Sequence, residues 1–118
     1  MTTNPDSQRA SDERAHPESG PPPLARDLLL PLRRAVDLYL AGDFALAEDR
    51  LRALVKAAPD QAQAHHHLGV VLRARGQFAG AIAHLERALE LDPHLVGAAD
   101  RIERYRAEQA QSRAGRAA

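Results

Sequence analysis

The sequence predicts an all-α fold from its composition, its apolar periodicity and the placement of its glycines and prolines. Ala, Leu and Arg dominate the 118 residues, and these residue types have high intrinsic helix propensity. Aromatic residues make up 3% of the chain and Trp is absent, which disfavours a β-sheet. From Leu24 onward, apolar residues recur at helical spacing, and glycine alternates with proline between the periodic segments.

The N-terminal 23 residues differ from the remainder in composition. They hold five of the eight prolines and contain no Val, Ile, Leu, Phe or Tyr. Such a segment cannot bury enough apolar surface to offset the entropy lost on ordering. We therefore expect residues 1–23 to form a disordered, proline-rich tail. Residues 114–118 are expected to be a flexible C-terminus.

Five helices are expected after this tail. The first begins near Leu24 and stops at Gly42, with Pro31 near its start, where a missing backbone donor is tolerated. Asp43 and Asp60 are expected to cap the second and third helices through their side chains. The expected ranges of the last four helices are 43–57, 60–75, 78–91 and 95–113.

The helices form an internal repeat with an offset of 34 residues. Aligning residues 28–61 with 62–95 reveals the shared string G-x-F-A-x-A-x3-L-x7-P, which is too ordered to arise from composition. The matched positions are Gly42, Phe44, Ala47, Leu51 and Pro59 in the first copy, and Gly76, Phe78, Ala81, Leu85 and Pro93 in the second.

This pattern resembles the tetratricopeptide repeat family. The family signature W-x2-L-G-x2-Y, A-x3-F, P is matched by His65-x2-Leu68-Gly69-x2-Leu72, by Ala81-x3-Leu85 and by Pro93. In the first repeat, Pro31 and Arg34 stand where Trp and Leu are usual, although Ala35 keeps the small residue. The resemblance implies an α-solenoid of two helix-turn-helix repeats, residues 24–61 and 62–95, with a capping helix over 96–113. Small side chains let paired helices approach closely, at Ala47, Gly69, Ala81 and Ala88.

The stretch AHHHLG, residues 64–69, invites a metal-binding interpretation. Consecutive helical residues point about 100° apart, so His65, His66 and His67 cannot converge on one ion. A helical zinc pair needs ligands at i and i+4, and no histidine has such a partner here. We expect His65 to face the core, and His66 to face either a partner or solvent. The sequence thus predicts no metal site.

Catalytic function is not indicated by the sequence. The chain has no cysteine, no glycine-rich phosphate loop and no Ser-His-Asp order, and carboxylates such as Glu48 and Glu86 are interpreted as solvated charges. We therefore expect a non-enzymatic protein without a cofactor. Lys plus Arg equals Asp plus Glu, at 16 each, which gives no field to attract nucleic acid or a membrane surface. Without a signal sequence or a membrane-spanning run, the expected location is cytoplasmic.

The resemblance implies protein binding through a concave groove, lined by the first helix of each repeat. The expected lining residues are Leu32, Val36, Tyr39, Gln63, His66, Val70 and Arg73, extended by Asp100 and Arg104 of the capping helix. Some members of the family clamp a partner's C-terminal carboxylate. Here Leu32 and Val36 occupy clamp positions and His67 replaces an amide, so we expect an apolar segment or amphipathic helix as the ligand.

Two alternatives remain open from the sequence. The first helix carries more apolar surface than one neighbouring helix can cover, which is consistent with a homodimer formed through it. The other alternative is an accessory subunit of an enzyme encoded elsewhere.

Overall fold

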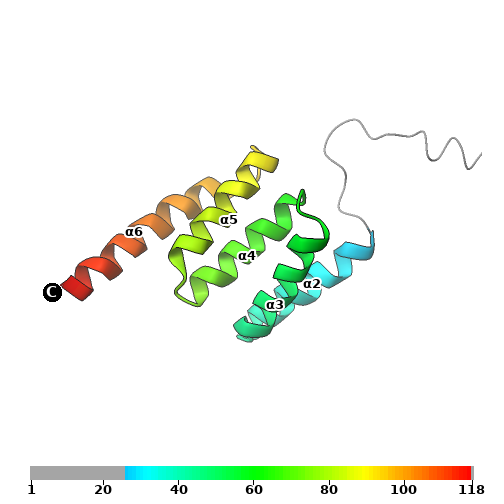
Figure 1. Ribbon diagram of the computed structural model, residues 1–118, viewed down its shortest axis with the longest axis horizontal. Helices are drawn as coiled ribbons and strands as arrows, with labels where there is room; N and C mark the ends of the chain where they lie inside the picture. Colours follow the sequence, from blue (N-terminus) through cyan, green and yellow to red (C-terminus); the bar gives the residue numbers. More distant parts are fainter. Residues whose placement is uncertain (1–25, 118) are drawn as a thin grey trace, which may run out of the picture.

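The computed structural model describes residues 26–117, and within that range every regular element is an α-helix (Figure 1). The helices are α2 (Arg26–Leu40), α3 (Phe44–Ala57), α4 (Ala62–Ala74), α5 (Phe78–Leu91) and α6 (Ala98–Ala117). The predicted all-α fold is confirmed. The predicted tail, residues 1–23, lies outside the described residues.

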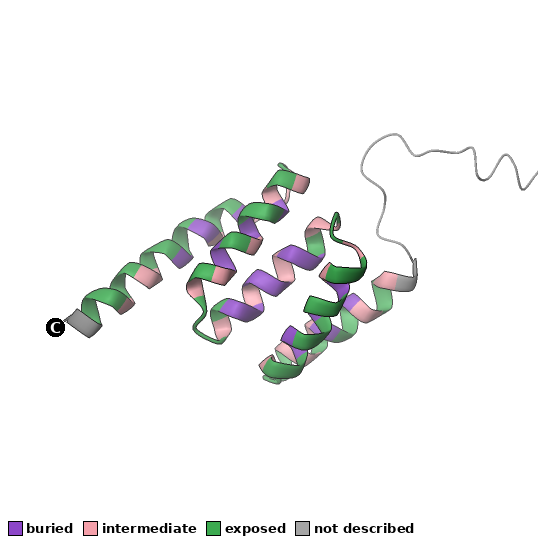
Figure 2. Cartoon of the chain, viewed as in Figure 1, coloured by how far each residue is buried: buried purple, intermediate pink, exposed green. Residues whose placement is uncertain are grey.

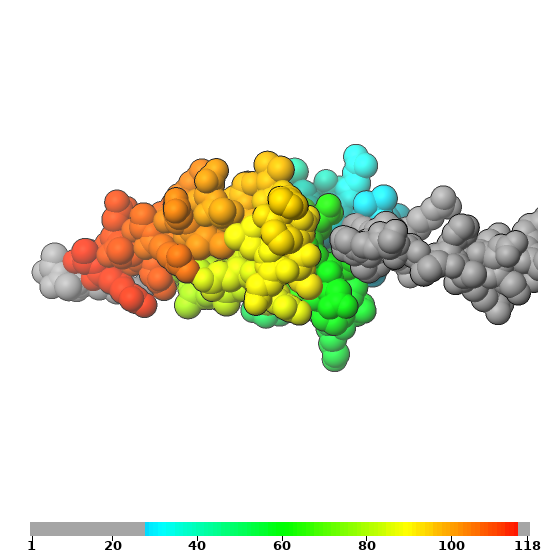
Figure 3. All heavy atoms as spheres, turned by 90° about the horizontal axis from the view of Figure 1, so that it is seen from above, coloured from blue at the N-terminus to red at the C-terminus, as the bar shows by residue number. Residues whose placement is uncertain are grey.

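The helices are stacked in chain order. Each helix packs against the next one along the chain, and α2 also touches α4. Figure 1 shows the α2–α3 pair at one end and α6 at the other, and the view from above in Figure 3 shows the same order. Helix α4 therefore lies in the middle, between α3 and α5, and this sequential stacking is the architecture of a solenoid.

The two turns inside the repeats are built in the same way. Gly42 and Gly76 have φ angles of 87° and 81°, which a residue with a side chain rarely adopts. After α2, the N–H of Asp43 donates to the carbonyl of Leu38 at 2.9 Å, and after α4 the N–H of Gln77 donates to that of Leu72 at 2.8 Å. These bonds satisfy carbonyls that the helix ends leave open, so each glycine closes a helix and starts a reversal of the chain.

Helix boundaries differ from the prediction at three places. Residues 59–60 form a turn, so α4 begins after Gln61, and neither Asp43 nor Gln61 makes a side-chain capping bond. Gly97 has a φ of 84°, which delays α6 to Ala98, and α6 continues to Ala117 through residues expected to be a flexible terminus. The Ala-rich and Arg-rich end of α6 favours helix and contains no proline.

The sequence predicts that Pro31 lies in the first turn of its helix. In the structure it lies inside α2, as the sixth of its 15 residues. At this position a residue with an N–H would donate to a carbonyl one turn earlier, so the proline leaves one helical bond unmade. The packing of α2 against α3 and α4 therefore offsets a local weakness of the helix.

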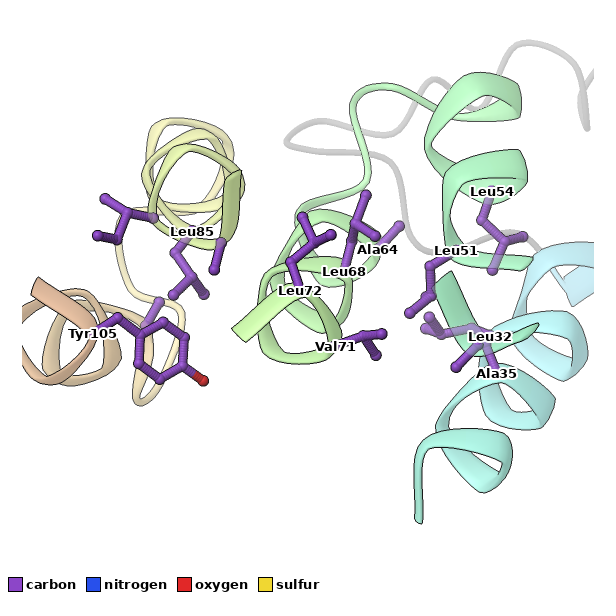
Figure 4. Packing of buried hydrophobic residues seen from close by; sticks show 14 of the residues in the cluster. Leu32, Ala35, Leu51, Leu54, Ala64, Leu68, Val71, Leu72, Leu85 and Tyr105 are labelled. Atoms are coloured by element: carbon purple, nitrogen blue, oxygen red, sulfur yellow. The ribbon is translucent and has the colours of Figure 1, made fainter. Parts of the chain in front are cut away.

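The core runs between the helices as one continuous cluster (Figure 4). Its largest fully buried side chains are Leu51, Leu68, Leu72, Leu85 and Val71. Figure 2 shows buried residues along α4, which supplies side chains to both of its neighbours. The approach of α4 to α5 is close: a Cβ on Gly69 would lie 2.9 Å from the carbonyl oxygen of Ala81 and 2.9 Å from Cγ of Leu85. Only a residue without a side chain fits there.

The residues matched by the repeat occupy equivalent places in the two helix pairs. Phe44 and Phe78 are partly buried and pack against the core, whereas Pro59 and Pro93 are exposed in the loops after α3 and α5. The matched positions with 0% exposure are Ala47, Leu51, Ala81 and Leu85. Three positions of the family pattern, Ala35, Leu68 and Ala88, are also 0% exposed.

Glu48 does not behave as the solvated charge that we expected. Its exposure is 8%, and its carboxylate accepts from Arg52 Nε at 2.7 Å and from Arg75 Nη1 at 2.9 Å. Arg75 follows α4, so this cluster ties the second helix of the first repeat to the end of the next helix. The burial depends on a contact between residues 27 positions apart, which helical periodicity alone does not reveal.

Helix α6 closes the stack. Ala98, Ile102 and Tyr105 are its buried residues, and the side chains beyond Tyr105 are mostly exposed. Across the described range, we find no helix with the length and apolar character needed to cross a membrane.

Candidate partner-binding groove

A hollow of about 190 Å³ lies where α2, α4 and α6 meet. We call it the inner groove, and it is lined by Val36, Tyr39, Leu40, Leu51, His66, His67, Val70, Val71 and Arg101. Leu51 and Val71 are almost fully buried and belong to the core, so they form its floor. The remaining side chains come from the first helix of each repeat and from α6, because these helices share one side of the stack.

Two neighbouring histidines give the inner groove a polar wall. The rings of His66 and His67 lie 5.2 Å apart, and Nε2 of His66 lies 3.5 Å from Nη1 of Arg101. Burial lowers the pKa of His66 to about 4, assisted by the nearby His67 and Arg101. Burial and then Arg101 also lower the pKa of His67. Both rings are therefore neutral at pH 7, and Arg101 supplies the positive charge of the groove.

Arg73 lies beside the groove and is already engaged. Its Nε donates to Oε1 of Glu108 at 3.0 Å, and its Nη2 donates to the other oxygen of the same carboxylate. The guanidinium also lies over the ring of Tyr105, with 5.9 Å from Cζ to the centroid. The hydrogen bond with Glu108 raises the pKa of Arg73 and, conversely, lowers the pKa of Glu108. These contacts hold α6 against α4, and they leave Arg73 less available to a ligand.

A comparison with protein families matches residues 32–95 to the family described as "Tetratricopeptide repeat". The chain belongs to the tetratricopeptide repeat family. It is also similar to a solved structure, the first such domain of Spaghetti (RPAP3) bound to the HSP90 peptide SRMEEVD, with 26% sequence identity and a TM-score of 0.66. The match covers 70% of this chain and 65% of the solved chain, so this chain spans less than two thirds of the length of that protein chain. No curated protein matches the sequence.

Of the groove residues expected from the sequence of this tetratricopeptide repeat protein, the structure brings Val36, Tyr39, His66 and Val70 together in the inner groove. Gln63, Asp100 and Arg104 are exposed and lie outside its lining. Leu32 is the clearest correction. It is 5% exposed and lies among Leu54 and Ala64, because the start of α4 covers it, so it belongs to the core.

Arg101, the cation of the groove, is not among the residues predicted from the sequence. The repeat contained a signal for it, since an offset of 34 from His67 leads to position 101. In a tetratricopeptide solenoid, equivalent positions of successive first helices lie on the same side of the stack. Extending the alignment into the capping helix would therefore have placed Arg101 beside the two histidines.

His65 points away from the inner groove, as expected for a core position. Its exposure is 6%, and its Nε2–H donates to the carbonyl oxygen of Pro59 at 2.9 Å. With its proton on Nε2, its Nδ1 accepts from Nδ1–H of His84 on α5, at 3.2 Å. Burial, His65 and Arg52 lower the pKa of His84. Within the described part of the chain, no three side chains of His, Asp or Glu are grouped to hold a metal ion.

Proposed function

We propose that this chain is a non-enzymatic protein-interaction module that binds a segment of a partner protein in the inner groove. The observation that carries the proposal is the convergence of Val36, Tyr39 and Val70 with a single cation, Arg101, in one hollow. Binding sites for peptides commonly combine apolar pockets with a few polar groups that fix the orientation of the ligand. The likeness to a structure with a bound peptide supports the same class of function.

The chemistry of the lining favours an amphipathic helix as the ligand. Apolar side chains of such a helix would cover Val36, Tyr39 and Val70, and an acidic side chain would pair with Arg101. His66 and His67 are neutral at pH 7, so they add hydrogen-bonding capacity without adding charge. Arg73 is held by Glu108, and we therefore assign the attraction for an acidic residue to Arg101 instead.

A terminal carboxylate is not the main determinant of binding in this proposal. The test uses the peptide SRMEEVD, which is bound in the similar structure, in its free-acid form and with an amidated C-terminus. Titration followed by NMR should show equal affinities within a factor of about three, because Leu32 is buried and Val36 is apolar. A preference of more than about tenfold for the free acid would contradict this part of the proposal.

The groove itself is tested with peptides selected from a displayed random library against the full chain. Val70→Asp places a carboxylate on the apolar wall and should weaken the selected peptides at least about tenfold. Ala79→Asp is the matched control, because Ala79 is exposed on α5 and does not line the groove. If Val70→Asp and Ala79→Asp bind equally well while both retain helical circular dichroism, the inner groove is not the binding site.

A further inference from the structure

A second hollow lies on the other side of the first repeat, on the outward side of α2 and α3. We call it the outer α2–α3 face, and its volume is about 700 Å³. Its lining includes Pro31, Arg34, Asp37 and Leu38 from α2, and Leu46 and Arg50 from α3. None of these residues lines the inner groove, so the two surfaces are separate.

The outer α2–α3 face leaves apolar side chains in contact with water. Leu46 is 38% exposed, and Leu30 on the adjoining part of α2 is 52% exposed. Between Thr2 and Pro23 the sequence contains no Val, Ile, Leu, Met, Phe or Tyr. An exposed apolar patch rimmed by charges is typical of a surface that binds another protein.

The two charges that α2 brings to this face are arranged so that they can complement those of a second copy. Arg34 and Asp37 lie one turn apart on α2, and neither forms an ion pair with another described residue. Apolar side chains flank them along the hollow, with Pro31 toward the start of α2 and Leu38 toward its end. If α2 of a second copy packs antiparallel against this face, apolar side chains therefore face apolar side chains, and an arginine faces an aspartate.

We propose that the outer α2–α3 face binds a second copy of the same chain, with the two α2 helices antiparallel about a twofold axis. Arg34 of each copy then lies opposite Asp37 of the other, and the pair occurs twice because a twofold interface repeats every contact. Leu38 and Leu46 of each copy cover the region around Pro31 of its partner. The ion pairs set the register of the two helices, and the apolar contacts supply the attraction.

Charge reversal tests this arrangement in solution. The full chain should sediment as a concentration-dependent dimer between micromolar and millimolar concentrations. Arg34→Asp leaves α2 with two negative charges at these positions, and Asp37→Arg leaves it with two positive charges. Each variant alone should therefore show a dimer dissociation constant at least about tenfold higher. Both residues are exposed, and the substitutions leave the core intact.

The decisive measurement is the mixture of the two variants. The face of the Arg34→Asp variant complements the face of the Asp37→Arg variant, because both cross-pairs then join opposite charges. An equimolar mixture should therefore form a heterodimer with near wild-type affinity. Arg113→Asp, an exposed change near the end of α6, is the control and should dimerise as the wild type does.

Three outcomes would overturn the proposal. They are a wild-type chain that stays monomeric throughout the concentration range, single variants that dimerise as strongly as the wild type, and a mixture that fails to pair. A heterologous partner seated on this face would give the first of these outcomes. Peptide binding in the inner groove is measured separately through Val70→Asp, so the failure of one proposal is distinguishable from the failure of the other.

Discussion

The two repeats share one sequence pattern but differ in what covers their N-terminal side. With the offset of 34, Arg34 and Asp37 in α2 correspond to Leu68 and Val71 in α4. Leu68 is 0% exposed and Val71 is 1% exposed because α3 packs over them, whereas Arg34 and Asp37 are exposed on a side that no described helix covers. The repeat pattern determines where the helices lie, and the neighbours determine which face must be apolar.

The largest difference is expected when the side chains of the equivalent residues Leu68 and Arg34 are each truncated to Ala. Leu68→Ala should lower the free energy of unfolding by about 2–5 kcal/mol, because it removes a fully buried side chain and leaves a cavity. Arg34→Ala should change it by less than about 0.5 kcal/mol, since its side chain lies at the surface. Urea denaturation of both variants measures the difference, and equal effects would show that the two faces are equally covered.

A second test concerns the close approach of α4 to α5. Gly69→Ala should destabilise the protein by about 1–3 kcal/mol, because the added methyl group meets the backbone of Ala81 and the side chain of Leu85. Gly115→Ala is the control: nothing lies within 4 Å of its added Cβ, and the change favours helix. A neutral Gly69→Ala variant would mean that the helices of the second repeat can move apart freely.

Features that depend on local interactions were predicted correctly from the sequence, whereas features that depend on contacts between distant residues were not. The pattern over 78–91 predicts α5 with the correct bounds, since glycine, proline and periodicity are local signals. The placement of Leu32 was wrong because α4 covers it, and the burial of Glu48 was missed because Arg75 reaches it from another helix. Arg101 stayed hidden because the repeat alignment ended before α6. Contacts between residues far apart in the chain are therefore what local sequence patterns do not reveal.

Acidification should weaken the fold through histidines of the second repeat. Burial lowers the pKa values of His66, His67 and His84, with that of His66 near 4, while unfolded histidines keep a value near 6.5. Between about pH 4 and pH 6.5 the unfolded chain therefore binds more protons than the folded chain. This contribution to stability is fully present above pH 6.5 and is lost as the pH falls toward 4.

For His66 this effect should amount to about 1 kcal/mol between about pH 7 and about pH 5, allowing for partial solvent screening. Urea denaturation at several pH values measures it, and His66→Gln should flatten the dependence. The first repeat contains no histidine in its helices, so exposed Arg34→Gln is a control that should retain the wild-type slope. A wild-type stability that is constant over this range would contradict the prediction.

The smallest expected effect concerns the attachment of α6 to the second repeat. Glu108→Gln removes the charge that holds Arg73 and should cost about 0.2–1 kcal/mol, because the pair is exposed and screened by salt. Glu103→Gln, an exposed residue of the same helix without a described ion pair, should have no measurable effect. Thermal unfolding at low and high salt checks both, and the difference should disappear at high salt.

The central position of α4 has a consequence for the order in which the chain opens. Its side chains complete the packing of both α3 and α5, so neither repeat can separate from the other without exposing α4. Backbone amides of α4 should therefore exchange with solvent only through global unfolding, whereas those in the last turns of α6 exchange through local fraying. Although the repeat is a unit of sequence, the cooperative unit of folding is centred on one helix and extends across the boundary between the repeats.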